Sequence, residues 1–253
     1  LREMAYYSHW LTPALRPKRF DTRFFVRLAP TAQEAMPDMG EALELLWLTP
    51  DEALQPQRAL KLLNVTQRTL QDMRGFASAR AAYDHALALR GVALHFPRPA
   101  LARDGSQRFI IEDHPAYDEV ARLDPDGRGD LRCELQSGDL TPLSPRLWRV
   151  AGRTGHAYLV HDPQGDDWVC LGGDDADAAQ QQALQARADR PPHRLADAAA
   201  EASLQVGPDT TLRAGHGGWL LAQDGLWIGD GPAPEGIDWI ASSQGFLRRR
   251  RTG

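Results

Sequence analysis

Short apolar runs separated by turn residues dominate the chain from about residue 107 onward, and they constrain its fold more than any other feature. The runs are rich in β-branched and aromatic side chains, and glycine, proline or aspartate interrupts the sequence between them. The predicted strands are 108–111, 131–135, 147–150, 157–160, 168–171, 211–213, 219–221, 226–228 and 239–240. One helix is expected among them, over about 175–187. This part of the chain is therefore predicted to be mainly β structure.

The preceding part of the chain mixes strand and helix signals. Apolar stretches at 24–28 and 44–48 predict two strands, and the proline-containing segment 29–39 between them is typical of a loop. The four residues that follow the second strand, Thr-Pro-Asp-Glu, favour a helix start, because they offer a capping threonine, an early proline and two carboxylates near the positive end of the helix dipole. A helix is therefore predicted over 52–63.

A longer helical pattern follows in the same region. It opens at 64–67, places apolar side chains on one face, continues through 77–90 and stops at Gly91. Together these signals predict an α+β protein with a first lobe at 1–75, a helical linker at 76–106 and a second lobe at 107–253.

Composition narrows the classes of function. The formal net charge of −5 gives no general electrostatic reason to bind nucleic acid or anionic lipid. Two cysteines are too few for a disulfide framework or a thiolate zinc site, which favours a reducing compartment. No apolar run approaches the roughly 20 residues that a membrane helix needs. A cytoplasmic protein that does not span a membrane is expected.

The first lobe contains three motifs that together carry a family resemblance. They are His-Trp-Leu-Thr-Pro at 9–13, Arg-Phe-Asp-Thr-Arg-Phe-Phe at 19–25, and the segment 41–54 with Leu-Leu-Trp-Leu-Thr-Pro-Asp-Glu at its centre. This lobe resembles the second half of a nudix hydrolase domain, of the branch related to coenzyme A diphosphatases. The resemblance implies carboxylates that gather a divalent metal on a pyrophosphate, held in an Arg-Glu-x-x-Glu-Glu box. That box does not occur in these 253 residues.

The second lobe resembles a metallo-β-lactamase-fold hydrolase of the kind fused behind nudix domains in some bacterial proteins. The segments that carry this resemblance are 113–117, 122–130, 143–150, 157–160, 225–230 and 238–247. In that family histidines and a bridging aspartate hold two metal ions. Here Asp230 matches the bridging carboxylate, Gln244 stands where the last histidine belongs, and His216 is the one candidate for the middle ligand. The resemblance implies a reduced scaffold without metal, in which Asp230 and His216 are remnants.

Four residues of the first lobe are candidates for a site. Glu41 and Glu44 lie where some nudix enzymes place an extra metal ligand or general base, and the alternative is that both face solvent beside a strand. Arg19 and Arg23 could clamp a diphosphate through paired hydrogen bonds, and the alternative is a salt bridge with Asp21.

The favoured hypothesis is a vestigial or noncatalytic member of this hydrolase lineage, with a structural or partner-binding role and no cofactor. A halved sheet leaves an exposed strand edge, so a homo-oligomer or a partner protein is expected to cover it. Nucleic acid is not expected as a partner, and the run of arginines at 248–251 is interpreted as a solvated tail.

Two alternatives remain open. One is a metal-dependent hydrolase of coenzyme A or nucleoside-diphosphate-linked compounds that uses Mg²⁺ or Mn²⁺, with its catalytic box upstream of Leu1 or in a partner chain. The other is a small-molecule binding module that uses a cleft without chemistry.

Overall fold

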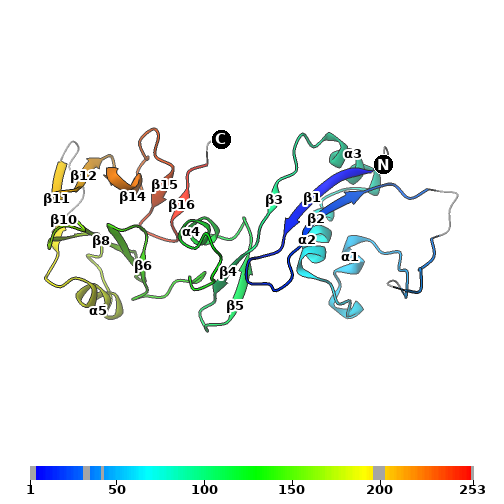
Figure 1. Cartoon of the computed structure of the whole chain (residues 1–253), viewed down its shortest axis with the longest axis horizontal. Coiled ribbons are helices and arrows are strands. Elements are labelled where there is room, and N and C mark those ends of the chain that lie inside the picture. Colours follow the sequence, from blue (N-terminus) through cyan, green and yellow to red (C-terminus); the bar gives the residue numbers. More distant parts are fainter. Residues whose placement is uncertain (1–3, 31–34, 41–42, 196–202, 252–253) are drawn as a thin grey trace. The chain divides into compact units, whose positions relative to one another are not determined.

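The structure is a computed structural model that describes residues 4–30, 35–40, 43–195 and 203–251. The chain forms two compact units, one from Leu1–Thr12 and Lys18–Phe96 and the other from Pro13–Pro17 and Pro97–Gly253. Helices and strands occur in both units, which confirms the predicted α+β class (Figure 1).

The first unit contains a small mixed sheet. Strand β1 (Ala5–Leu11) pairs antiparallel with β2 (Asp21–Val26) on one side and parallel with β3 (Leu94–His95) on the other. Trp10 on β1 is buried, its Nε1 donates to Ser8 Oγ at 2.7 Å, and its ring stacks on His95 with 4.6 Å between ring centroids. The indole therefore anchors β3 to β1. The predicted strand at 24–28 overlaps β2, although β2 begins and ends earlier.

The helices of this unit are short. They are α1 (Pro50–Ala53), a 3₁₀ turn at Pro56–Arg58, α2 (Asn64–Met73) and α3 (Ala79–Ala88). Thr49 caps α1 as the sequence predicts, because its Oγ accepts from the Glu52 backbone N–H and the Glu52 carboxylate accepts from the Thr49 N–H. The helix predicted over 52–63 is wrong. Pro56 keeps the preceding residue, Gln55, in an extended conformation, so the helix ends before it.

The long helical pattern after residue 64 is divided in two. α2 starts where the sequence predicts, and α3 restarts behind Ser78, whose Oγ accepts from the Ala81 N–H at 3.1 Å. A glycine at position 75 and this capping serine separate the two helices, since glycine disfavours a continuous helix and serine favours a new start.

The strand predicted at 44–48 does not form in the described structure. These residues lie in irregular chain, and Leu45, Leu46 and Trp47 are exposed, Trp47 to 73%. The amino-acid pattern favours a strand, but a strand also needs a neighbour to satisfy its backbone groups. No described residue supplies that neighbour.

The second unit begins with a hairpin and a helix. β4 (Arg98–Leu101) and β5 (Gln107–Ile110) pair antiparallel, and α4 (Tyr117–Leu123) follows. In place of the strand predicted at 131–135 there is one isolated bridge, between Leu101 and Arg132.

Two sheets make up the rest of this unit. The first has the order β10-β9-β8-β7-β6, from β6 (Leu140–Pro142), β7 (Leu147–Val150), β8 (Ala157–His161), β9 (Trp168–Leu171) and β10 (His193–Leu195). The second has the order β11 to β16, from β11 (Ser203–Gly207), β12 (Thr210–Gly215), β13 (Gly218–Leu221), β14 (Leu226–Gly229), β15 (Trp239–Ala241) and β16 (Arg248–Arg249). Strand predictions from 147 onward agree with these elements to within a few residues. Arg248 and Arg249, from the run predicted as a solvated tail, form the edge strand β16, and both remain exposed to solvent.

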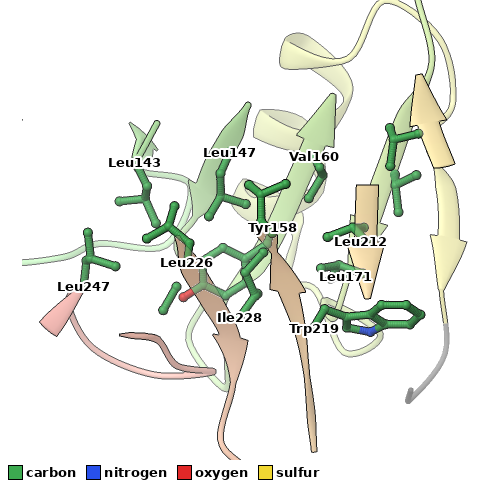
Figure 2. Close-up of a cluster of buried hydrophobic side chains, with 14 residues drawn as sticks. Leu143, Leu147, Tyr158, Val160, Leu171, Leu212, Trp219, Leu226, Ile228 and Leu247 are labelled. Atoms are coloured by element: carbon green, nitrogen blue, oxygen red, sulfur yellow. The ribbon is translucent and has the colours of Figure 1, made fainter. Parts of the chain in front are cut away.

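Helix α5 (Ala178–Arg187) connects β9 to the parallel strand β10 and covers the outer face of the first sheet. Alternation along β8 and β9 explains the layering. Leu159 and Cys170 point toward α5, whereas Tyr158, Val160 and Leu171 point toward the second sheet. Figure 2 shows these inner side chains meeting Leu212, Leu226 and Ile228. The core of the unit therefore lies between the two sheets.

Candidate functional site

The carboxylates predicted from the nudix resemblance do not form a described cluster. Glu41 lies outside the described residues. Glu44 lies in the irregular segment 43–48, where it is exposed and makes no hydrogen bond or ion pair with a described residue.

Arg23 belongs to a network of polar side chains on one face of β1 and β2. His9 lies opposite Arg23 in the strand register, and Asp21, two residues before Arg23 on β2, lies diagonally across from His9. The Asp21 carboxylate contacts both neighbours, with 2.5 Å from Oδ1 to His9 Nε2 and 3.1 Å from Oδ2 to Arg23 Nη2. The hydrogen bond from His9, helped by Arg23, lowers the pKa of Asp21. Arg23 therefore forms the salt bridge that the alternation of β2 allows, and half of its side chain remains exposed.

Arg19 does not join this network. Its Nε donates to the Thr12 carbonyl at 3.0 Å, and its guanidinium lies over the ring of Phe96, 5.9 Å from the centroid. The two arginines predicted to act as one clamp are thus engaged with different partners.

Aromatic side chains continue the face that carries His9 and Arg23. Tyr6 and Phe25 are a cross-strand pair with stacked rings, 5.3 Å between centroids, and Phe25 is 48% exposed. A partly exposed guanidinium beside aromatic rings can contact an anionic ligand with a flat apolar part.

The second unit contains a cleft of about 420 Å³ at one end of its two sheets. Its walls come from the start of β8, the end of β9, the turn between β12 and β13, the end of β14, and single residues of β10 and of the segment after β15. Polar contributions are His156, Tyr158, Asp174, Asp230 and Ser243.

Asp230 is held by the chain segment 242–245. Its Oδ1 accepts from the Ser243 N–H at 2.9 Å, and the segment is tied in turn to the start of β8. The His156 N–H donates to the Ser243 carbonyl at 2.7 Å, and Tyr158 Oη donates to the Ser242 carbonyl at 2.5 Å. Gln244, which stands where the related family has its last histidine, donates its amide to the Thr154 carbonyl at 3.3 Å. Through these hydrogen bonds the segment 242–245 connects the start of β8 to Asp230 at the end of β14.

His156 and Tyr158 are neutral in this setting. Burial, reinforced by the nearby Arg149, lowers the pKa of His156 to about 4. Its Nδ1 accepts from the Gly152 N–H, so Nε2 carries the proton and donates to the Gly245 carbonyl at 3.0 Å. Burial raises the pKa of Tyr158 well above its usual range.

His216 does not reach the cleft. It is exposed on the turn between β12 and β13, it is not among the residues that line the cleft, and it makes no side-chain hydrogen bond within the described chain. No three histidine, cysteine, aspartate or glutamate side chains come together as metal ligands anywhere in the part of the chain that is described.

The glycines beside His216 have a packing role. A Cβ on Gly218 would lie 2.6 Å from the ring of Trp227, and one on Gly231 would lie 1.8 Å from the His216 carbonyl oxygen. Glycine is needed at position 218 because the buried indole of Trp227 packs directly against the backbone of the β12–β13 hairpin.

Sequence reasoning missed His156, Asp174 and Ser243 as neighbours. The available signal was the antiparallel pairing of β8 with β9, which brings the residue before β8 and the residues after β9 to the same end of the two strands. Ser243 had no such signal, because it comes from a loop of the other sheet. No described helix has the length and apolar character to cross a membrane.

Comparison with known proteins gives one partial similarity. Human acyl-coenzyme A diphosphatase NUDT19 is 24% identical over 168 residues, in a match that covers 61% of this chain and 42% of that protein. The match thus spans less than half of the relative's length. No family model and no solved structure matches the chain. The comparisons give no support to a metallo-β-lactamase-like domain, whereas they support a nudix-like relationship for part of the chain.

Proposed function

We propose that this chain is a noncatalytic relative of nudix hydrolases, with a structural or partner-binding role and no metal or cofactor of its own. The observation that carries the proposal is that candidate side chains make hydrogen bonds and ion pairs within the protein. The Asp230 carboxylate accepts a hydrogen bond from a backbone N–H, and the Gln244 amide donates one to a backbone carbonyl. Arg23 forms an ion pair with Asp21. Each of these side chains therefore contributes to the fold. Of the residues that match the family's metal ligands, Asp230 alone is a carboxylate beside the cleft, and one carboxylate does not hold a metal ion firmly.

Within this proposal, residues 107–253 form a reduced metallo-β-lactamase-like lobe. Support comes from the two sheets that share one core, from the outer helix α5, and from Asp230 at the end of β14 beside a cleft. Gln244 and the isolated His216 agree with loss of the family's metal ligands.

A turnover assay tests the catalytic side of the proposal. The chain is incubated with coenzyme A, acyl-coenzyme A and nucleotide sugars in Mg²⁺ or Mn²⁺, and release of the phosphorylated products is followed by chromatography. We expect no release above the protein-free blank. Metal-dependent release that is lost in Glu44→Gln and kept in a Glu235→Gln control would overturn the proposal.

The partner-binding side rests on the exposed apolar segment 43–48. Leu43, Leu45, Leu46 and Trp47 are all exposed to 43% or more, which is unusual for side chains of this size in adjacent positions. We propose that this segment completes a sheet in a homo-oligomer. Light scattering should report a mass above that of one chain, and Leu45→Glu with Trp47→Glu should return it to the monomer. A wild-type chain that remains monomeric at all concentrations would contradict the oligomer.

A metal-dependent diphosphatase is the second candidate, and the similarity to an acyl-coenzyme A diphosphatase favours it. In this version Arg19 and Arg23 contact the diphosphate, Glu41 and Glu44 assist the metal, and Mg²⁺ or Mn²⁺ is held mainly by carboxylates outside this sequence. Adding the in-frame coding sequence that precedes Leu1, if it encodes an Arg-Glu-x-x-Glu-Glu box, should then produce turnover. A cytoplasmic location is proposed for either version, and fractionation of cells would test it.

A further inference from the structure

Several wall positions of the cleft in the second unit are glycines. Gly172, Gly217, Gly218 and Gly229 all line it, and a Cβ on Gly218 or Gly229 would clash with neighbouring atoms. The backbones of the β12–β13 turn and of β14 therefore pack closely beside the cleft. A volume of about 420 Å³ is within the range of small-molecule sites.

The inner wall of the cleft is apolar. Leu171 and Ile228 come from the two facing sheets, and the indole of Trp219 lies at their edge (Figure 2). Tyr158 adds its ring to this wall while its hydroxyl is used by the Ser242 carbonyl. A ligand that enters this far would gain free energy by burying an apolar body.

The charged groups that line the cleft, Asp174 and Asp230, are acidic and exposed to solvent. Asp230 Oδ1 is held by the Ser243 N–H, but its second oxygen makes no hydrogen bond with a described residue. Asp174 reaches Arg194 only at 4.0 Å, and that arginine donates to the Gly173 carbonyl at 3.2 Å. His156 has both ring nitrogens engaged by backbone, so it adds no positive charge.

We propose that this cleft binds a small primary amine with an apolar body, its ammonium group against the open oxygen of Asp230 and its apolar part against Trp219, Leu171 and Ile228. The Asp230 carboxylate is preorganised by Ser243, so little side-chain freedom is lost on binding. The acidic lining selects the cation over an anion or a neutral alcohol of the same shape. This site is independent of any nudix activity.

The test is a comparison of three probes of one shape by isothermal titration calorimetry. Phenethylamine, 2-phenylethanol and 3-phenylpropionate differ chiefly in the group that would meet Asp230. We expect the amine to bind about threefold or more tightly than the alcohol, as an ion pair to an exposed carboxylate allows, and the carboxylate not to bind. Equal affinity of amine and alcohol would overturn the proposal.

Two variants sharpen the result. Asp230→Asn should reduce the amine's advantage over the alcohol to less than twofold or so, because a neutral amide keeps the shape and removes the charge. Asp238→Asn is the matched control, since Asp238 is exposed outside the cleft, and it should leave the advantage unchanged. An equal effect of both substitutions would contradict a site at Asp230.

A readout on the wild-type chain covers the case in which Asp230→Asn fails to fold. In ¹H–¹⁵N spectra, phenethylamine should shift the Trp219 indole N–H and leave that of Trp10, in the other unit, in place. Absence of a Trp219 shift at millimolar amine would refute the site. None of these outcomes bears on hydrolytic turnover, so the amine site and the proposed function stand or fall separately.

Discussion

One buried ion pair holds together three parts of the second unit that are far apart in sequence. Arg149 on β7 forms a two-pronged contact with Glu119 on α4, with 2.8 Å from Nη2 to Oε1, and both side chains are almost fully buried. Glu119 also accepts from the Leu247 N–H at 2.6 Å. Removal of either charge leaves the other without its partner in a dry environment.

Arg149→Met should therefore lower the free energy of unfolding by about 3–5 kcal/mol, the usual cost of breaking a buried pair. Arg108→Met is the control, because Arg108 pairs with Glu134 at a half-exposed surface, and it should cost about 1 kcal/mol at most. Adding Glu119→Gln to Arg149→Met should recover part of the loss, since an amide oxygen can still accept from Leu247. Equal urea midpoints for the Arg149 and Arg108 variants would show that the buried pair is unimportant.

His156 predicts a pH dependence of stability with a defined sign. Its pKa is about 4 in the folded chain against 6.5 for the free side chain, so between these values the unfolded state binds a proton that the folded state does not. Unfolding becomes easier as pH falls through this window. His156→Asn removes the titration, so its free energy of unfolding should decline less steeply than wild type from pH 6.5 to 4. Above that window the two slopes should agree, and parallel slopes inside it would contradict the assignment.

At the scale of elements, alternation and turn residues predicted the strands β7 to β9 and β12 to β15 of the two larger sheets, but not the edge strands β6, β10, β11 and β16. Trp168 and Cys170 face α5 while Val169 and Leu171 face the other sheet, and such two-sided burial produces a continuous apolar run that is easily recognised. Predictions from local sequence were wrong where a proline or the lack of a pairing strand determined the structure. Pro56 ended a helix that the capping residues of α1 had started, and the strand pattern at 44–48 had no described strand to pair with.

Packing around Trp227 gives a prediction for the hairpin of β12 and β13. Gly218→Ala would place a methyl group 2.6 Å from the indole and 2.7 Å from the Ile228 carbonyl oxygen, so the backbone must shift. Overpacking of this kind costs roughly 1–3 kcal/mol. Gly165→Ala is the control, because its Cβ would meet only ordinary contacts beginning at 3.4 Å. Thermal unfolding should separate the two variants, and equal melting temperatures would argue against tight packing at this hairpin.

At the scale of the whole molecule, family resemblance located individual residues but not their associations. Asp230 lines a cleft, His216 is not among the residues that line it, and Arg19 and Arg23 contact different partners. The residues that hydrogen-bond to these side chains come from segments far away in the sequence. Ser243 reaches Asp230 from the segment after β15, and His156 reaches Gly245 from the first sheet. Such contacts depend on sheet order, which no local sequence pattern specifies.

Among the described residues no three potential metal ligands come together, and we propose that the chain binds no metal ion of its own. Elemental analysis of purified protein, after dialysis against buffer with micromolar Mn²⁺ and Zn²⁺, measures this most directly. We predict far less than one bound metal ion per chain, with no change in Asp230→Asn or Glu44→Gln. One or more ions per chain that disappear in either variant would show that the chain does bind a metal through these carboxylates.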